Sequence, residues 1–176
     1  MRLRSLIHLA RVARALTLQR RIIVFGSSSL LASFRELGEP GNLLETTFDA
    51  DFLVDDIDDQ LAAVLNEAIG EDSLFQSREG YYIDVPRPAI TELLPQAWEQ
   101  RLIALRECEN VFCLEPHDLA VAKLRAGRPK DIVLLRDLLC AGRLKAEIVR
   151  ERLALTRMSE AAIAAAHQTL CAAEQA

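Results

Sequence analysis

Val24-Phe25-Gly26-Ser27-Ser28-Ser29 and Thr47-Phe48-Asp49-Ala50-Asp51-Phe52 are the two stretches of sequence that decide the fold. The first predicts a buried strand over residues 22–25 that breaks at Gly26 into a serine-rich helix start. The second predicts a strand whose two carboxylates, Asp49 and Asp51, project from one face, because alternate side chains of a strand share a face. Two such carboxylates repel each other unless a cation, usually a divalent metal, lies between them, and backbone N–H groups at a glycine turn suit a phosphate. Together the two stretches indicate metal-dependent transfer of a phosphoryl or nucleotidyl group.

The composition is that of an ordinary soluble globular protein, with 176 residues of which 51% are hydrophobic and 27% charged. A chain of this length forms one domain, or a core with a small appendage. The net charge of −5 argues against a broad nucleic-acid-binding surface, although Arg and Lys gather at residues 125–130 and 143–152. Arginines interrupt the N-terminal apolar run, which predicts an amphipathic helix rather than a signal sequence, and no apolar stretch is long enough to span a bilayer. The four cysteines show no close paired spacing, so they predict reduced thiols in a cytoplasmic protein.

Apolar periodicity and turn residues predict strands that alternate with helices in the first part of the chain and a helical C-terminal part. The predicted strands are residues 22–25, 46–54, 81–85, 101–105 and 110–114. The predicted helices are residues 3–20, 28–36, 117–126, 130–141, 145–156 and 159–173. A further helix is predicted to follow the acids of 55–59 and to stop at Gly70. We expect residues 1–115 to form an α/β core with the N-terminal helix, and residues 116–176 to form the helical part.

Two charged residues of the C-terminal part lie on apolar helical stripes. Lys123 follows Leu119 by one turn, and Asp131 precedes Leu135 by one turn in the next predicted helix. Buried charges need partners whatever the function of the protein. The pattern therefore leaves two interpretations open: a structural ion pair that ties two helices together, or two groups that face a site.

Three features in chain order resemble one protein family: Gly26-Ser27, the strand with Asp49 and Asp51, and the run EPHDLAVAKLRAGRPKD from Glu115 to Asp131. They are similar to the DUF6036 nucleotidyltransferase-like proteins, which are themselves similar to the AbiEii-type toxins and to the polymerase-β-like nucleotidyltransferases. The same family's middle section is matched by Gly80-Tyr81-Tyr82 and Leu94-Pro95-x-x-Trp98-x-x-Arg101-Leu102, so the resemblance covers roughly residues 22–143. It implies the minimal nucleotidyltransferase fold, an α+β fold with a small mixed sheet flanked by helices and a helical C-terminal part. It also implies the transfer of a nucleotidyl group from a nucleoside triphosphate (NTP).

The resemblance implies roles for the residues of the first two features. Gly26 and Ser27, helped by Ser28, would hold the triphosphate. Asp49 and Asp51 would be catalytic residues that bind Mg²⁺ or Mn²⁺. The residues by themselves leave plainer alternatives open, because the serines could be helix caps and the aspartates a solvated strand face.

The resemblance also implies roles for the C-terminal part. Lys123 would contact the nucleotide and Asp131 would be the acid of the last motif, both as catalytic residues. Arg128 and Lys130 would neutralise the phosphates or an acceptor RNA. Related enzymes carry a third carboxylate on a later strand, and the candidates for that metal ligand are Asp84 and, as an alternative, Asp131.

We therefore expect a metal-dependent nucleotidyltransferase that acts on an unknown acceptor, either a tRNA or other RNA or a protein. The resemblance also implies a role as the toxin of a toxin–antitoxin pair, with the cognate antitoxin as a protein partner. The interval from Ser27 to Asp49 is longer than in minimal enzymes, and without a third carboxylate the catalytic base is missing. A degenerate nucleotide-binding module and a protein-interaction module on the same fold are the alternatives. No membrane partner is expected, and the sequence determines no particular oligomeric state.

Overall fold

The computed structural model describes residues 1–175, which divide into two compact units. The first unit contains Met1–Pro88 and Leu102–Leu114, and the second contains Ala89–Arg101 and the chain from Glu115 onward. The long segment of the second unit thus begins beside the predicted boundary at residues 115 and 116, while Ala89–Arg101 joins this unit from earlier in the chain. That the two units are separate domains stays a prediction.

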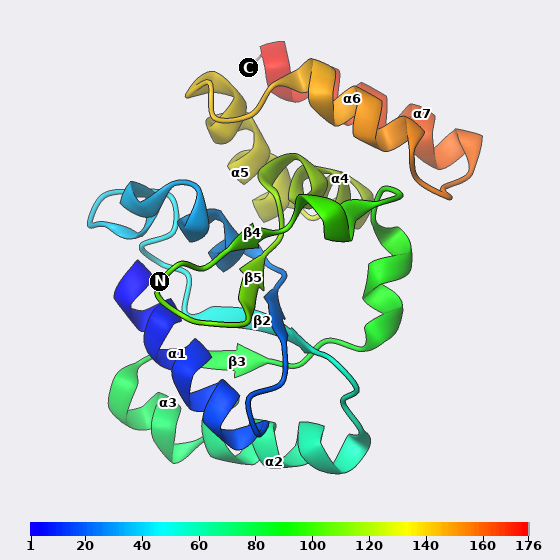
Figure 1. Cartoon of the computed structure of the whole chain (residues 1–176). Helices are drawn as coiled ribbons and strands as arrows, with labels where there is room; N and C mark the ends of the chain where they lie inside the picture. The colour runs from blue at the N-terminus through cyan, green and yellow to red at the C-terminus, as the bar shows by residue number, and fades with distance from the viewer. Residues whose placement is uncertain (176) are drawn as a thin grey trace. The chain divides into compact units, whose positions relative to one another are not determined.

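A five-stranded mixed sheet forms the first unit, with the strand order β3-β2-β1-β5-β4 (Figure 1). The strands are β1 (Ile22–Val24), β2 (Asp49–Val54), β3 (Tyr82–Asp84), β4 (Ile103–Ala104) and β5 (Val111–Cys113). Antiparallel pairing joins β1 to β2 and β4 to β5, whereas β1 with β5 and β2 with β3 pair in parallel. The predicted small mixed sheet is confirmed, although each strand is shorter than the sequence indicated.

Burial explains why β1 and β2 lie inside this sheet. All three residues of β1 are buried, as expected for an apolar run in a central strand. In β2, Ala50 and Phe52 are fully buried, whereas Asp49 and Asp51 on the opposite face are partly exposed. One face of β2 therefore packs into the core, and the other face carries the two carboxylates.

Three helices accompany the sheet in the first unit: α1 (Leu3–Leu16), α2 (Asp59–Ile69) and α3 (Leu74–Glu79). Figure 1 shows α2 and α3 below β3. α1 buries the stripe that predicted it, which consists of Leu6, Leu9, Ala10 and Ala13. α2 begins at Asp58, whose side chain accepts a hydrogen bond from the Leu61 N–H, and ends at Gly70.

The predicted α-helix over residues 28–36 is wrong, because this segment forms two 3₁₀ helices, η1 (Ser27–Ala32) and η2 (Arg35–Gly38). Phe34, between them, has a non-helical backbone with φ −133° and ψ 78°. Serine is a weak helix former, and the leucines Leu30, Leu31 and Leu37 are fully buried. Packing of these leucines, rather than helix propensity, determines the path of the backbone after Gly26.

Three short elements were not predicted: α3, η3 (Pro88–Leu93) and η4 (Trp98–Arg101). Each is too short to show a helical period in the sequence. α3 does carry local signals, since the Ser73 hydroxyl accepts a hydrogen bond from the Gln76 N–H and Gly80 ends the helix with a left-handed backbone at φ 78°.

The second unit is helical, as predicted, and contains η3 from Ala89 onward, η4, α4 (Pro116–Ala126), α5 (Pro129–Cys140), α6 (Ala146–Ala154) and α7 (Glu160–Gln175). Glu115 caps the start of α4, Gly127 ends it in the left-handed region at φ 62°, and Pro129 occupies the first turn of α5. Within residues 1–175 no helix is long and apolar enough to cross a membrane.

Candidate functional site

Three carboxylates share one face of the sheet in the first unit. β2 and β3 pair in parallel with Asp51 opposite Asp84 and Asp49 opposite Tyr82. Residues that are opposite each other in neighbouring strands project to the same face, so Asp49, Asp51 and Asp84 lie on one side. The sheet thereby brings Asp84, a residue far from the other two in sequence, beside the predicted carboxylate pair.

The negative charges around this face act on two of its titratable groups, Asp84 and Tyr82. Partial burial, followed by the charges of Asp49 and Glu71, raises the pKa of the Asp84 carboxyl above its usual range. Burial and then the charges of Glu71, Asp49 and Asp84 also raise the pKa of the Tyr82 phenol. This accumulation of negative charge is the kind that a bound cation relieves.

The donor set of this face fits a hard divalent cation. Carboxylate oxygens are the ligands that Mg²⁺ prefers, and Mg²⁺ is commonly held by one or two protein carboxylates together with substrate phosphates. Within residues 1–175 no three His, Cys, Asp or Glu side chains are arranged to hold a metal ion by themselves. A metal at Asp49 and Asp51 would therefore take further ligands from the substrate.

The glycine turn lies directly against this face. A Cβ atom at Gly26 would be only 1.8 Å from the Oδ2 atom of Asp51, so only glycine leaves room for that carboxylate. The backbone of Gly26 is extended (φ −74°), so space rather than conformation requires the glycine here. The Phe25 N–H donates a 2.8 Å hydrogen bond to the Asp51 carbonyl and holds the turn on β2. The turn and the carboxylate strand, which are separate in the sequence, form one feature of the structure.

The serines after Gly26 start a 3₁₀ helix and provide no side-chain cap for it. Ser28 and Ser29 are each 1% exposed, and within the described residues neither hydroxyl has a hydrogen-bond partner. A buried hydroxyl without a partner costs free energy, and in native proteins such a group calls for an explanation such as a ligand or a water molecule. The alternative that these serines are helix caps is therefore not supported by their contacts.

Gly26→Ala is expected to abolish the geometry of the site while leaving the fold in place. The new methyl group must displace the Asp51 carboxylate, because the two would be 1.8 Å apart. Overpacking of this kind costs roughly 1–3 kcal/mol of stability, and a displacement of about 1 Å in a reacting group costs on the order of a hundredfold in turnover. Thermal unfolding and the rate of the nucleotidyl transfer that the sequence predicts measure the two effects. A folded variant with the turnover of the wild type would show that Asp51 has no part in such a transfer.

Lys123 and Asp131, in the second unit, pair directly with each other. The Lys123 Nζ atom lies 2.7 Å from the Asp131 Oδ1 atom, and the residues are 5% and 1% exposed. Arg128, which is more exposed, donates from Nε to the Asp131 Oδ2 atom at 2.6 Å. Burial alone would raise the pKa of Asp131, but the bonds from Arg128 and Lys123 hold it below its usual range. The contacts are those of a buried ion pair, while a contact of Lys123 with nucleotide stays a prediction, as does the role of the exposed Lys130.

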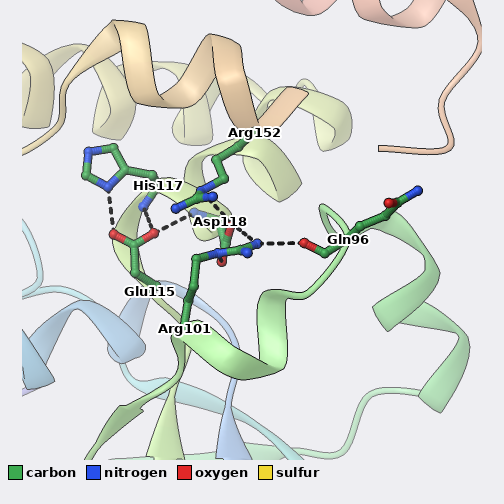
Figure 2. A network of polar contacts seen from close by, with 6 residues as sticks. All are labelled: Gln96, Arg101, Glu115, His117, Asp118 and Arg152. Carbon is green, nitrogen blue, oxygen red and sulfur yellow. Dashed lines mark hydrogen bonds and ion pairs between the residues drawn. The ribbon is translucent and has the colours of Figure 1, made fainter. Parts of the chain in front are cut away.

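A second buried carboxylate of this unit was missed by the sequence analysis. Asp118 is fully buried and accepts two hydrogen bonds from Arg101, from Nε at 2.8 Å and from Nη2 at 3.0 Å, while Arg152 lies 3.5 Å away (Figure 2). Beside it, the His117 ring contacts Glu115 through Nδ1 at 2.6 Å and accepts the Lys145 N–H through Nε2 at 3.1 Å. Figure 2 shows that Arg101 also donates to the Gln96 carbonyl. This network ties η4, α4 and α6 together.

Comparison with known proteins gives one match. The family model for nucleotidyltransferases of unknown function (DUF6036) matches residues 1–172. No curated protein and no solved structure matches the chain.

Proposed function

This chain belongs to the DUF6036 family of nucleotidyltransferases. We therefore propose that it transfers a nucleotidyl group from an NTP to an acceptor hydroxyl in the presence of Mg²⁺ or Mn²⁺. The proposal is supported by one observation above all: the Asp51 carboxylate lies against the Gly26 turn and opposite Asp84 in the sheet. Phosphate-binding backbone and metal-binding carboxylates must be neighbours for this reaction.

Each part of this site has a role in the proposed reaction. Asp49 and Asp51 would hold the metal together with phosphate oxygens of the NTP, while a metal contact of Asp84 stays a prediction. The metal would supply positive charge to the phosphates and favour ionisation of the acceptor hydroxyl. The N–H groups that follow Gly26, with the Ser27 hydroxyl, bind the triphosphate. The Ser28 hydroxyl is buried, so its contact with the triphosphate stays a prediction.

The proton of the acceptor hydroxyl goes to a carboxylate of the same face. Asp84 suits this step, because it lies opposite Asp51 in the neighbouring strand and on the same face. The acceptor oxygen bonds to the α-phosphorus, the bond from that phosphorus to the bridging oxygen breaks, and pyrophosphate leaves. We assign Asp131 to its ion pair and not to this step, since Lys123 and Arg128 already occupy its oxygens.

The acceptor in this proposal is an RNA, with a protein as the alternative. A toxin role with a cognate antitoxin rests on the similarity of the family to AbiEii-type toxins, and the residues themselves add nothing to it.

A transfer assay tests the proposed function. We expect the protein, incubated with Mg²⁺ and NTPs labelled at the α-phosphate, to transfer label to RNA or to protein from a cell extract. Asp51→Asn should reduce transfer by about a thousandfold or more, since loss of a charged group that stabilises the transition state has effects of this order. Asp56→Asn is the matched control, because Asp56 is exposed and its left-handed backbone (φ 52°) is well tolerated by asparagine. Equal transfer by wild type and Asp51→Asn would refute the assigned site.

A catalytically inactive nucleotide-binding module is the second candidate. It is favoured by the finding that the described residues contain no set of three ligands able to hold a metal without help from a substrate. Such a module would bind Mg²⁺ and NTP without any transfer of label.

A further inference from the structure

A cavity of about 630 Å³ in the first unit lies beside the candidate site and has no role in the reaction described above. We call it the α1 cavity. It is lined by the start of α1, by the residues that precede β2 and by the end of α3, among them Arg2, Arg4, His8, Phe48, Glu79 and Tyr81. Its size is within the range of sites that take small organic ligands, roughly 300–1,000 Å³.

The arginines of the α1 cavity lack acidic partners. Within the described residues neither Arg2 nor Arg4 forms an ion pair. The carboxylate of Glu79 accepts a hydrogen bond from the Tyr81 hydroxyl at 3.2 Å, and Glu45 accepts one from the Gly41 N–H at 2.8 Å. The cavity therefore offers two guanidinium groups that form no ion pair among the described residues, and its two carboxylates accept hydrogen bonds from neutral groups.

The position of these arginines is unfavourable in the absence of an anion. Arg2 is the N-cap of α1 and Arg4 lies in its first turn, which contains no acidic residue. The N-terminus of a helix carries a partial positive charge, so cations there are destabilising and an anion is stabilising. A phosphate between the two guanidinium groups would remove this cost.

An exposed aromatic ring borders the same cavity. Phe48 is 56% exposed, an unusual fraction for a phenylalanine, and it is not covered by a neighbouring ring among the described aromatic pairs. Tyr81 lies on another wall, where its ring packs edge-on against Phe75 at 5.8 Å. Exposed aromatic side chains together with arginine are the elements with which proteins bind the bases and phosphates of single strands.

The α1 cavity adjoins the carboxylate face. Phe48 and Gly80 also line a second cavity, of about 520 Å³, which contains Asp49 and Tyr82. A ligand that stacks on Phe48 thus ends one residue from the start of the carboxylate strand. A transferase needs its two substrates in adjoining subsites. The subsite with the arginines suits a nucleic-acid strand, because the strand carries a negative charge at each phosphate.

We propose that the α1 cavity binds a nucleotide of a single-stranded nucleic acid, whose phosphates contact Arg2 and Arg4 and whose base stacks on Phe48. The identification of this strand as the acceptor rests on the proposed function, whereas the binding site itself does not. The overall charge of −5 agrees with a local rather than a broad contact.

Fluorescence anisotropy with a labelled single-stranded RNA of about twelve nucleotides tests the proposal at low ionic strength. We expect Arg2→Gln/Arg4→Gln to weaken binding about tenfold or more and to lower the salt dependence by about two ions. Phe48→Ser should also weaken binding about tenfold, as for other stacking residues. The matched controls are Arg78→Gln/Arg87→Gln, which removes the same charge from exposed residues of the same unit, and Leu74→Ser at an exposed apolar residue. The controls should stay within about twofold of wild type.

Two further arms distinguish other occupants. A labelled acidic peptide that binds more tightly than the RNA, with the same losses in the variants, would assign the cavity to a protein partner and overturn the proposal. If the cavity variants lose as much affinity for free Mg²⁺–ATP as for the RNA strand, the cavity binds the free nucleotide, and the proposal is overturned. An equal loss in the controls would also overturn it. The proposal is supported if Mg²⁺–ATP raises the melting temperature of the arginine and Phe48 variants as much as that of the wild type. If wild type itself shows no such stabilisation, the proposed function fails while the RNA measurement still decides the cavity.

Discussion

Asp131→Leu is expected to destabilise the protein by about 3–5 kcal/mol, because it leaves Lys123 buried with no countercharge. The lysine is 5% exposed and its Nζ atom is bonded to the Asp131 carboxylate at 2.7 Å. Lys123→Met should cost clearly less, since Arg128 keeps Asp131 paired through bonds of 2.6 and 3.4 Å. The double variant Lys123→Met/Asp131→Leu should recover most of the loss, because both buried charges are then gone.

Chemical unfolding of the four proteins measures this cycle. Asp137→Leu is the matched control, because Asp137 lies on the same helix in a half-exposed pair with Arg136, and such pairs contribute little. If Lys123→Met leaves the stability unchanged and instead removes Mg²⁺–NTP binding, the lysine serves the nucleotide and the structural interpretation fails. If the double variant is no more stable than Asp131→Leu, the two charges do not compensate each other.

Asp118→Ala is expected to have an effect of the same size, about 3–5 kcal/mol, because it removes the carboxylate that pairs with both Arg101 and Arg152 (Figure 2). Asp118 has no exposed surface, and the two arginine side chains are 18% and 24% exposed. Burial raises the pKa of Asp118 even against the opposing effect of Arg101, so the cost of burying this carboxylate exceeds the stabilisation that the arginine gives to its charged form. The loss should appear as a lower midpoint of chemical unfolding.

Loss of either arginine that contacts Asp118 should destabilise the protein, and the loss of the better hydrogen-bonded one should cost more. Arg101→Ala removes a two-fold hydrogen-bonded contact and should cost more than Arg152→Ala, whose Nε atom is 3.5 Å from Asp118 and lacks a hydrogen bond within the described residues. Glu151→Ala, at an exposed position in the middle of α6, is the control and should change stability by less than about 0.5 kcal/mol. The reverse ranking, or no effect of Asp118→Ala, would contradict the view that this network holds η4 to α4 and α6.

The sequence was sufficient for features that local pattern determines. Apolar periodicity or a helix cap is visible within a few residues in three such features: the apolar run of β1, the alternation in β2 and the run from Glu115 to Asp131. The helix expected over residues 28–36 failed because buried leucines, and not propensity, set its backbone. Long-range packing overrides a weak local preference in such segments.

The site could be predicted only in part. Asp49 and Asp51 are visible as neighbours in one strand, but the pairing of Asp51 with Asp84 depends on the register between β2 and β3, which no local pattern shows. Asp118 was missed for a similar reason, since an acid in the first turn of a helix ordinarily stabilises that turn and needs no partner. Its partners Arg101 and Arg152 come from segments distant in the sequence.

The shift in melting temperature on binding of Mg²⁺–ATP to the apo protein is the measurement that tests the central claim most directly. A ligand selective for the native state stabilises it by about 2.7 kcal/mol at a hundred times its Kd, so the wild type should melt at a higher temperature when both Mg²⁺ and ATP are present. Asp49→Asn/Asp51→Asn should abolish the metal-dependent part of that shift and leave the apo stability within about 1 kcal/mol, because mutual repulsion of the two acids is removed. An equal metal-dependent shift in wild type and variant would show that the metal binds elsewhere and that the assigned nucleotidyltransferase site is wrong.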